Sequence, residues 1–159
     1  MSLNLPKSIK MVITDFDGIV TDNCVYIDSE GNMSRKLNFK DIMAFSLLRK
    51  NGFKIGIISG EANSAIDVIN KKFDIEEVHQ GIRNKIEVLN MIIEKYNLSD
   101  DEFVYIGDDV NDFDSLSCSK WALTVPDAIE KVKSIPHIQI TKKSSGDGAF
   151  REIVDSLLY

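Results

Sequence analysis

Runs of apolar residues alternate with amphipathic segments along most of the chain. The apolar runs predict strands, clearly at 10–14, 53–58 and 103–106 and more weakly at 76–79, 121–125 and 137–140. Elsewhere apolar residues recur at helical spacing, which predicts helices within 62–73, 86–96 and 150–158. Strands that alternate with helices in this way indicate an α/β fold with a parallel sheet.

Residues 24–39 break this alternation. Two strand-like segments, 24–28 and 33–39, flank a turn at 29–32, and the pattern predicts a β-hairpin inserted between the first strand and the first long helix. A lone hairpin is marginally stable in water, so we expect it to pack on something, such as another subunit. The insertion is too short for a large enzyme lid, and an active site here would be open unless a neighbouring chain covered it.

Composition narrows the class of protein. The 159 residues, 43% of them hydrophobic, fit one globular domain that spans the whole chain. A net charge of −6 argues against a general nucleic-acid surface. Neither a membrane span nor a signal core is visible, so we expect a cytoplasmic protein. Cys24 and Cys118 are too few for a disulfide framework, and we expect two buried, reduced thiols.

Acidic residues follow two of the predicted strands, at the edge where open parallel sheets place their ligands. They are Asp15 and Asp17 after the first strand, and Asp108, Asp109 and Asp112 after the strand at 103–106. If these strands are neighbours, five carboxylates converge and require a hard divalent cation, for which Mg²⁺ is the usual choice near phosphate. The alternatives are a solvated acidic turn for the first pair and ordinary first-turn helix acids for Asp109 and Asp112.

Two further polar signals lie at strand or helix ends. Ser59 and Gly60 end the strand at 53–58, where a hydroxyl and free backbone N–H groups suit an anionic oxygen, although Ser59 would also serve as a helix N-cap. Asn84 and Glu87 have the spacing of a capping box, which places Lys85 in a first helical turn, where positive charge is unfavourable. A local rule broken near a predicted site indicates function, and a solvent-facing lysine is the alternative.

These motifs, in this order, resemble those of haloacid dehalogenase-type phosphatases. The motifs are Asp15-x-Asp17-Gly18, Ser59, Lys85 and Gly107-Asp108-Asp109-x-x-Asp112. Within that superfamily the chain looks like the capless 3-deoxy-D-manno-octulosonate 8-phosphate phosphatases, with which it shares the hairpin, the segment 80–85 and the tail 146–152. The resemblance implies a three-layer, Rossmann-like sheet without a large cap domain. It also implies a homotetramer in which neighbouring subunits help to cover each site.

The same resemblance implies a phosphomonoester hydrolase that works through an aspartyl-phosphate. Asp15 would be the nucleophile, and Asp17 would protonate the leaving alkoxide and then deprotonate water. The phosphoryl oxygens would be held by Ser59, Lys85 and the backbone N–H groups around Phe16 and Gly60. Mg²⁺ would be held by the Asp15 and Asp108 carboxylates and the Asp17 backbone carbonyl. Asp109 and Asp112 would orient metal-bound waters or Lys85.

The family branch leaves two substrate classes open, because it includes phosphatases of nine-carbon keto-sugar acid 9-phosphates. Glu61 and Lys72 look more like those enzymes, and the octulosonate enzymes commonly carry arginine at the positions of Glu61 and Lys40. The expected substrate is therefore a keto-sugar acid phosphate with eight or nine carbons. Lys40, Lys72 and Arg151 are candidates for holding its carboxylate or hydroxyls, across a subunit boundary if need be.

Two other classes of protein compete with an enzyme. A phospho-accepting receiver domain also combines acids, a hydroxyl, a lysine and Mg²⁺, but its phosphorylated aspartate follows a middle strand, whereas Asp15 follows the first strand. A catalytically silent copy of the fold, used for oligomerisation, is the second alternative, although every motif residue is present. Release of free phosphate from a phosphomonoester would distinguish an enzyme from both.

Overall fold

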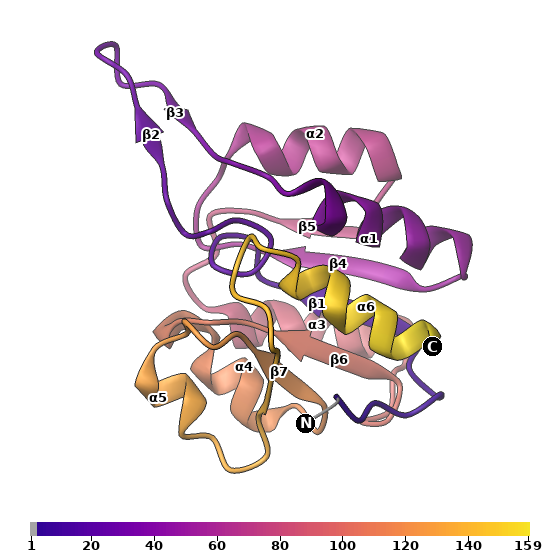
Figure 1. The fold of residues 1–159 in the computed structure, drawn as a ribbon. Coiled ribbons are helices and arrows are strands. Elements are labelled where there is room, and N and C mark those ends of the chain that lie inside the picture. The colour runs from indigo at the N-terminus through magenta and orange to yellow at the C-terminus, as the bar shows by residue number, and fades with distance from the viewer. Residues whose placement is uncertain (1–2) are drawn as a thin grey trace.

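The structure, a computed structural model, describes residues 3–159, and a six-stranded parallel sheet lies at their centre (Figure 1). The strand order across the sheet is β5-β4-β1-β6-β7-β8. The strands are β1 (Met11–Thr14), β4 (Lys54–Ile58), β5 (Glu77–His79), β6 (Phe103–Ile106), β7 (Ala122–Thr124) and β8 (Gln139–Ile140). Each lies within a range that the apolar runs predict, and the parallel α/β fold is confirmed.

Helices cover both faces of this sheet, which gives the three layers expected (Figure 1). One face carries α1 (Phe39–Lys50), α2 (Ser64–Phe73) and α6 (Ala149–Leu158). The other face carries α3 (Lys85–Tyr96), α4 (Phe113–Cys118) and α5 (Glu130–Lys133), with a 3₁₀ turn at Val110–Asp112 before α4. Within residues 3–159 no cap domain covers the sheet, in agreement with the resemblance.

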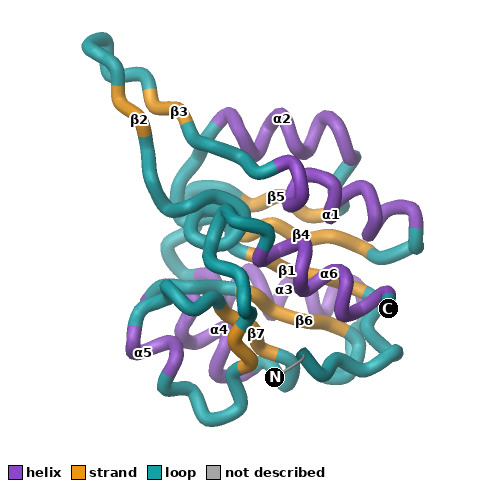
Figure 2. The backbone as a smooth tube through the Cα atoms, in the orientation of Figure 1, coloured by secondary structure: helices purple, strands orange, loops and turns teal. Residues whose placement is uncertain are grey.

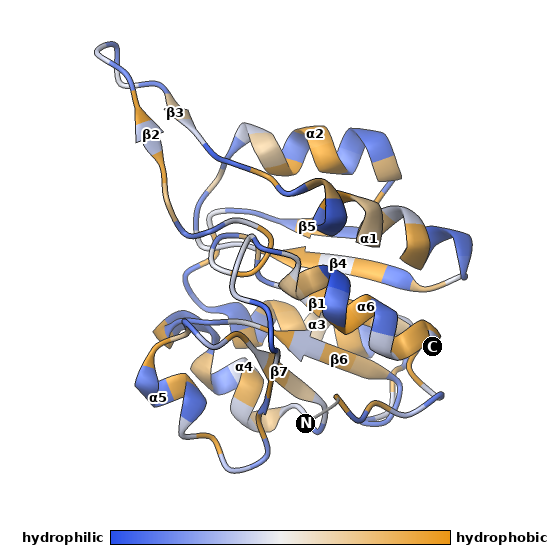
Figure 3. Ribbon diagram, in the orientation of Figure 1, coloured by the Kyte–Doolittle hydropathy of each residue, from blue (hydrophilic) through white to orange (hydrophobic). Residues whose placement is uncertain are grey.

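The central strands are largely apolar because they lie in the core, between two layers of helices. All four residues of β1 are buried, because helices cover both faces of a parallel sheet. Figure 3 shows hydrophobic colouring over much of β4 and over parts of the helices around it. Phe45 of α1 packs on Phe73 and Phe150, with ring centroids 5.8 and 4.8 Å away, and so joins α1 to the end of α2 and to α6.

The sheet brings the predicted acidic loops to one place. In the register of β1 with β6, Thr14 lies opposite Ile106, so Asp15 and Gly107 leave the sheet side by side. The chain turns from β1 toward β4 and from β6 toward β7, which makes the gap between β1 and β6 a topological switch point. Figure 2 shows the loops that follow the strands gathered at this end of the molecule.

The hairpin is present but shorter than predicted. Its strands are only β2 (Tyr26–Ile27) and β3 (Met33–Ser34), and it projects from the body of the molecule (Figure 1). The second strand does not reach Phe39, because Asn38 accepts a hydrogen bond from the Lys40 N–H and so starts α1. Within residues 3–159 these two strands form a separate sheet with no third strand to extend their pairing.

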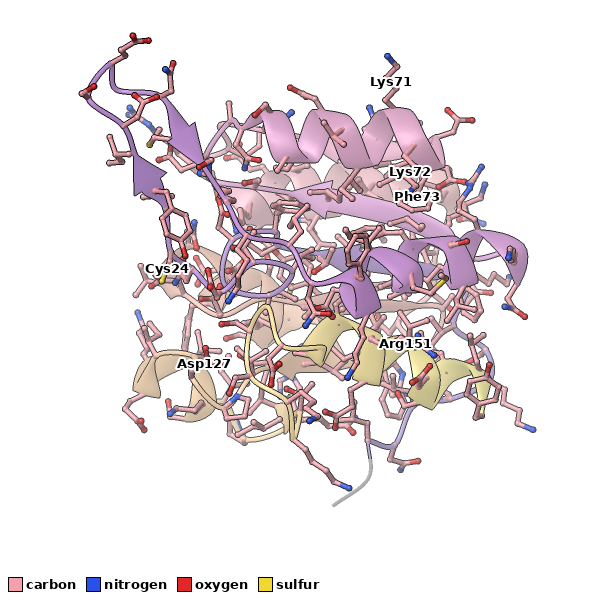
Figure 4. The ribbon with its side chains drawn as sticks, turned by 45° about the horizontal axis from the view of Figure 1, so that its top comes forward. Cys24, Lys71, Lys72, Phe73, Asp127 and Arg151 are labelled. Carbon is pink, nitrogen blue, oxygen red and sulfur yellow. The ribbon has the colours of Figure 1, made fainter. Side chains whose placement is uncertain are left out.

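The expectation of two buried cysteines is wrong. Cys24 and Cys118 are free thiols, as predicted, but both are exposed. Cys24 lies at the foot of the hairpin (Figure 4), and Cys118 is the last residue of α4, so both stand at the ends of elements and not on packed faces. Among residues 3–159, none of the helices has the length and apolar character that a membrane crossing requires.

Candidate active site

A pocket of about 170 Å³ opens where β1, β4 and β6 end. Its lining is Asp15, Asp17, Asn23, Ser59, Gly60, Glu61, Asp108, Asp109 and Asn111. Seven of these nine residues were predicted from the sequence, and the sheet brings them together from three separate loops. The pocket is small and polar, and five of its nine lining residues are acidic, so a compact anionic group would need a cation beside it.

Lys85 lies directly behind this pocket. It begins α3 and is only 1% exposed, so the solvent-facing alternative is wrong. Its Nζ is 2.8 Å from Asp15 Oδ2 and 2.8 Å from Asp112 Oδ1. Burial opposes the charge of Lys85, but attraction to the two carboxylates outweighs burial and raises its pKa. The predicted capping box is absent, since the Asn84 side chain makes no cap bond and donates to Glu87 instead.

Asp112 is an acceptor with both oxygens in use. Oδ1 accepts from Lys85 and from the Tyr105 hydroxyl at 2.8 Å, and Oδ2 accepts from the backbone N–H groups of Asp108 and Asp109 at 3.3 and 3.4 Å. The carboxylate therefore fixes the lysine and the second acidic loop together. Burial and the Asp112 charge raise the pKa of Tyr105 well above its usual range, so the phenol stays a donor.

Asp15 and Asp108 carry charge that the surrounding side chains do not balance. Burial first, and then repulsion from Asp112, raise the pKa of Asp15 well above its usual range despite Lys85. Burial, with repulsion from Asp112 and Asp109, raises the pKa of Asp108 to about 7. Asp108 Oδ1 is buried without a hydrogen-bond partner among the described residues. An additional positive charge next to Asp15 and Asp108 would offset the repulsion between these buried carboxylates.

These residues fit a divalent cation. One carboxylate oxygen from each of Asp15, Asp108 and Asp112 lies within 4.8 Å of the others. Oxygen ligands of this kind are those that hard divalent cations prefer. Because Asp112 already accepts from four donors, the ion would be held by Asp15 and by Asp108, whose Oδ1 has no partner within the described part of the chain.

The remaining predicted phosphate contacts lie at the pocket or beside it. Ser59 is not a helix N-cap, because α2 starts later and Asn63 caps it by accepting from the Ile66 N–H at 3.1 Å. The Ser59 hydroxyl instead lines the pocket and donates to the Glu61 carbonyl at 2.8 Å. The Phe16 N–H, a predicted phosphate donor, donates here to Asp15 Oδ1 at 2.6 Å.

The three predicted substrate-binding cations do not line this pocket. Lys40 and Arg151 share a separate hollow of about 500 Å³ with Lys142 and Lys143, and Arg151 Nε pairs with Asp155 at 2.7 Å. Lys72 lies in the last turn of α2, over the Phe73 ring (Figure 4). The other end of that helix faces the pocket, and ten helical residues span about 15 Å. Lys72 is therefore remote from the pocket of its own chain.

Sequence reasoning missed four residues at the site. Asn23 Nδ2 donates to Asp108 Oδ2 at 3.4 Å, and Asn111 lines the pocket. Both lie within or next to the acidic motifs, so proximity to those motifs was a usable signal. Arg35 Nε donates to Asp17 Oδ1 at 2.8 Å, and Asn63 Nδ2 approaches Asp17 Oδ2 at 3.5 Å. No periodicity or spacing points to these two contacts.

Comparison with known proteins agrees with this geometry. A curated relative, the 3-deoxy-D-manno-octulosonate 8-phosphate phosphatase of Escherichia coli K12, is 26% identical over 153 residues, which are 96% of this chain and 80% of the relative. The structure of the enzyme of that name from Moraxella catarrhalis, solved with magnesium, phosphate and the octulosonate, has a TM-score of 0.89 at 28% identity and covers 96% and 87% of the two chains.

A third similar protein is the cobalt-bound deoxy-D-mannose-octulosonate 8-phosphate phosphatase of Haemophilus influenzae, with a TM-score of 0.87, 25% identity, and coverage of 96% and 88%. These relatives support the prediction that the chain is a phosphatase. Residues 55–153 match the sequence profile of the haloacid dehalogenase-like hydrolases. That match spans more than half of the chain and removes the receiver-domain alternative. The chain therefore belongs to the haloacid dehalogenase-like hydrolase family, as its motifs predict.

Proposed function

We propose that the protein is a magnesium-dependent phosphatase that passes a phosphoryl group through Asp15. The observation that carries this proposal is the setting of Asp15. Its carboxylate is buried at the pocket, is paired with Lys85 at 2.8 Å, and lies near the carboxylate of Asp108, one oxygen of which has no hydrogen-bond partner among residues 3–159. A nucleophile, a fixed cation and an incomplete ligand set for a second cation thus meet at one point.

The reaction follows from these positions. An Asp15 oxygen attacks phosphorus while the ester P–O bond breaks, and Asp17 gives its proton to the departing oxygen. Asp17 then takes a proton from the water that attacks the aspartyl-phosphate, and phosphate leaves with Asp15 restored. Lys85, Ser59 and the Gly60 backbone N–H hold the phosphoryl oxygens, and the lysine supplies charge where the transition state concentrates it.

Magnesium fits the remaining ligand set. It would be held by the carboxylates of Asp15 and Asp108 and by the backbone carbonyl of Asp17. Asp109 and Asp112 would orient its waters or Lys85. When bound, the ion supplies positive charge that lowers the electron density of the phosphoryl group. The similar Moraxella enzyme was solved in complex with a magnesium ion, which supports this choice of metal.

The proposed substrate is a keto-sugar acid phosphate, either an octulosonate 8-phosphate or a nonulosonate 9-phosphate. The names of the similar enzymes support the first, and Glu61, which lines the pocket, supports the second together with Lys72. The volume of the pocket suits the phosphate end, so the sugar acid would extend outside it. Comparison of kcat/KM across phosphorylated eight- and nine-carbon keto acids would decide between the two.

The outer part of the substrate site would come from other copies of the chain, in a homotetramer. The hairpin supports this proposal, since Tyr26 and Ile27 are 62% and 64% exposed on a two-stranded element that is marginal alone. Lys72, which is remote from its own pocket, and the hollow lined by Lys40 and Arg151 are available to a neighbour's substrate.

Asp15→Asn tests the proposed chemistry. We expect phosphate release to fall at least about 1,000-fold, because the amide is not a nucleophile. The thermal midpoint should not fall, since the substitution removes a buried charge that Asp112 repels. Asp114→Asn, an exposed acid in α4, is the matched control and should keep full activity. Retained activity in Asp15→Asn would overturn the proposal, and a wild-type chain that hydrolyses no phosphomonoester would indicate the silent copy.

A further inference from the structure

Arg35 has surroundings unlike those of its neighbours on the hairpin. It directly follows β3, and Met33 and Lys36 on either side of it are well exposed. The Arg35 side chain is only 5% exposed, whereas that of Lys36 is 57% exposed. A guanidinium covered to this degree needs an acceptor for its hydrogen bonds. The hairpin therefore sends one charged side chain inward, toward the pocket.

The partner of Arg35 is Asp17, the proposed acid and base. Arg35 Nε donates to Asp17 Oδ1 at 2.8 Å, and the Thr21 hydroxyl donates to the same oxygen at 3.0 Å. Among residues 3–159, the other oxygen, Oδ2, has a single hydrogen-bonding neighbour, Asn63 Nδ2 at 3.5 Å. A charge-assisted bond and a second donor thus hold one oxygen and fix the rotation of the carboxylate. Oδ2 is left as the oxygen available to a ligand in the pocket.

We infer that Arg35 is a positioning residue for Asp17, an inference that rests on the proposed function. By holding Oδ1, it makes Oδ2 the atom that carries the transferable proton. That proton moves from Oδ2 to the ester oxygen as the P–O bond breaks, and the Asp17 carboxylate that results remains paired with Arg35. In the second step Oδ2 takes one proton from the attacking water, which restores the starting state.

A purely structural role predicts something different. Arg35 would then only tie the hairpin to the first loop, as Lys36 does through its ion pair with Asp22 at 2.7 Å. Loss of such a tie would reduce activity toward all phosphomonoesters alike. Loss of a positioned acid instead reduces activity most where the leaving group needs a proton. An alkoxide needs one, and p-nitrophenolate leaves without one.

The experiment compares kcat/KM for 3-deoxy-D-manno-octulosonate 8-phosphate and for p-nitrophenyl phosphate, since this parameter includes the step in which the leaving group departs. In Arg35→Met we expect a fall of about 10- to 100-fold for the sugar phosphate and of less than about 3-fold for the aryl phosphate. Lys36→Met, which removes the adjacent hairpin-to-loop ion pair, should leave the ratio of the two unchanged. Arg35→Gln, which keeps a donor without the charge, should fall between wild type and Arg35→Met.

Equal losses on both substrates in Arg35→Met, or no loss on either, would overturn the inference while the phosphatase proposal stood. If Arg35→Met does not fold by circular dichroism, Arg35→Gln decides, and an unchanged substrate ratio in that variant overturns the inference. Failure of the proposed function has a different signature, because the wild-type chain would then release phosphate from neither ester.

Discussion

Gly18, in the first acidic loop, lies against Asp108 of the second. Its φ is +91°, and a Cβ atom built there would lie 2.1 Å from Asp108 Oδ2. A side chain at this position would therefore be strained by the backbone and would also displace a proposed metal ligand. The closeness of the loops, and not only the flexibility of the turn, requires glycine here.

Gly18→Ala should destabilise the fold by roughly 3 kcal/mol, the sum of a left-handed backbone and an overpacked contact. Activity should fall at least about 100-fold with it, because Asp108 moves. Gly31→Ala is the control and should cost only about 1 kcal/mol, since Gly31 has a φ of +85° but a Cβ built there meets no atom of residues 3–159 within 4 Å, its chain neighbours aside. Urea unfolding measures the loss of stability, and phosphate release measures the loss of activity. Equal losses of unfolding free energy in the two variants would contradict the steric argument.

Magnesium binding should depend on pH through Asp108. The pKa of its carboxyl is raised to about 7, so the metal-free chain holds this proton at pH 5 and has largely lost it at pH 8. Because the ion needs the ionised form, its affinity should be at least about 100-fold weaker at pH 5 than at pH 8, and the raised pKa of Asp15 adds to this effect. Titration calorimetry would show this, with Asp108→Asn binding weakly at both pH values. An affinity independent of pH would exclude Asp108 as a ligand.

The same shift has a consequence for stability, with a defined sign. The folded-state pKa of Asp108 lies above that of the unfolded chain, so this group disfavours the metal-free fold progressively as pH rises from about 4 to about 7. Saturating magnesium should reverse the trend, because it favours the ionised carboxylate in the folded state.

At the scale of single elements, α2 and α3 begin differently although both start after an asparagine. Asn63 accepts the Ile66 N–H at 3.1 Å, while the Asn84 side chain makes no cap bond. Asn63→Ala should therefore cost about 1 kcal/mol of unfolding free energy. Asn84→Ala should cost less than about 0.5 kcal/mol, the worth of its contact with Glu87. Urea titrations of both variants test this, and a larger cost for Asn84→Ala would be inconsistent with the assigned caps.

The elements differ in how far the sequence could predict them. Buried strands such as β1 and β6 are unbroken apolar runs, because both faces of the sheet are covered, and their positions were predicted within a residue. The hairpin strands were predicted too long, because turn chemistry locates a hairpin but its extent depends on whether a third strand pairs with it. The cysteines were misplaced because residue type predicts average burial, whereas exposure at the end of an element is set by packing.

The candidate site was predictable only in part, for a related reason. Acids that follow strands belong to a local pattern, and parallel pairing of β1 with β6 then brings them together. Arg35 and Asn63 reach Asp17 because of how the hairpin and α2 fold back, and such distant contacts leave no trace in the spacing of residues. The only sign in the sequence that Lys85 is buried at the site was its position in a first helical turn, where positive charge is unfavourable.

At the scale of the whole molecule, assembly should depend on the apolar side chains of the hairpin. Replacing Tyr26 and Ile27 together by serine should reduce the oligomer to smaller species, since it removes most of the exposed apolar surface of β2. Val68→Ser, an equally exposed apolar residue on α2, is the control and should leave the assembly intact. Sedimentation velocity measures the outcome, and a wild-type chain that stays monomeric at all concentrations would contradict the proposed tetramer.

The central position of β1 also bears on the order in which the molecule is made. Its two neighbours, β4 and β6, are synthesised well after it, so the first strand leaves the ribosome without either partner. Non-local pairing of this kind delays folding until the later segment is available. The proposed nucleophile, Asp15, is therefore translated before both strands that flank β1, and it reaches its working surroundings only after they have paired with it.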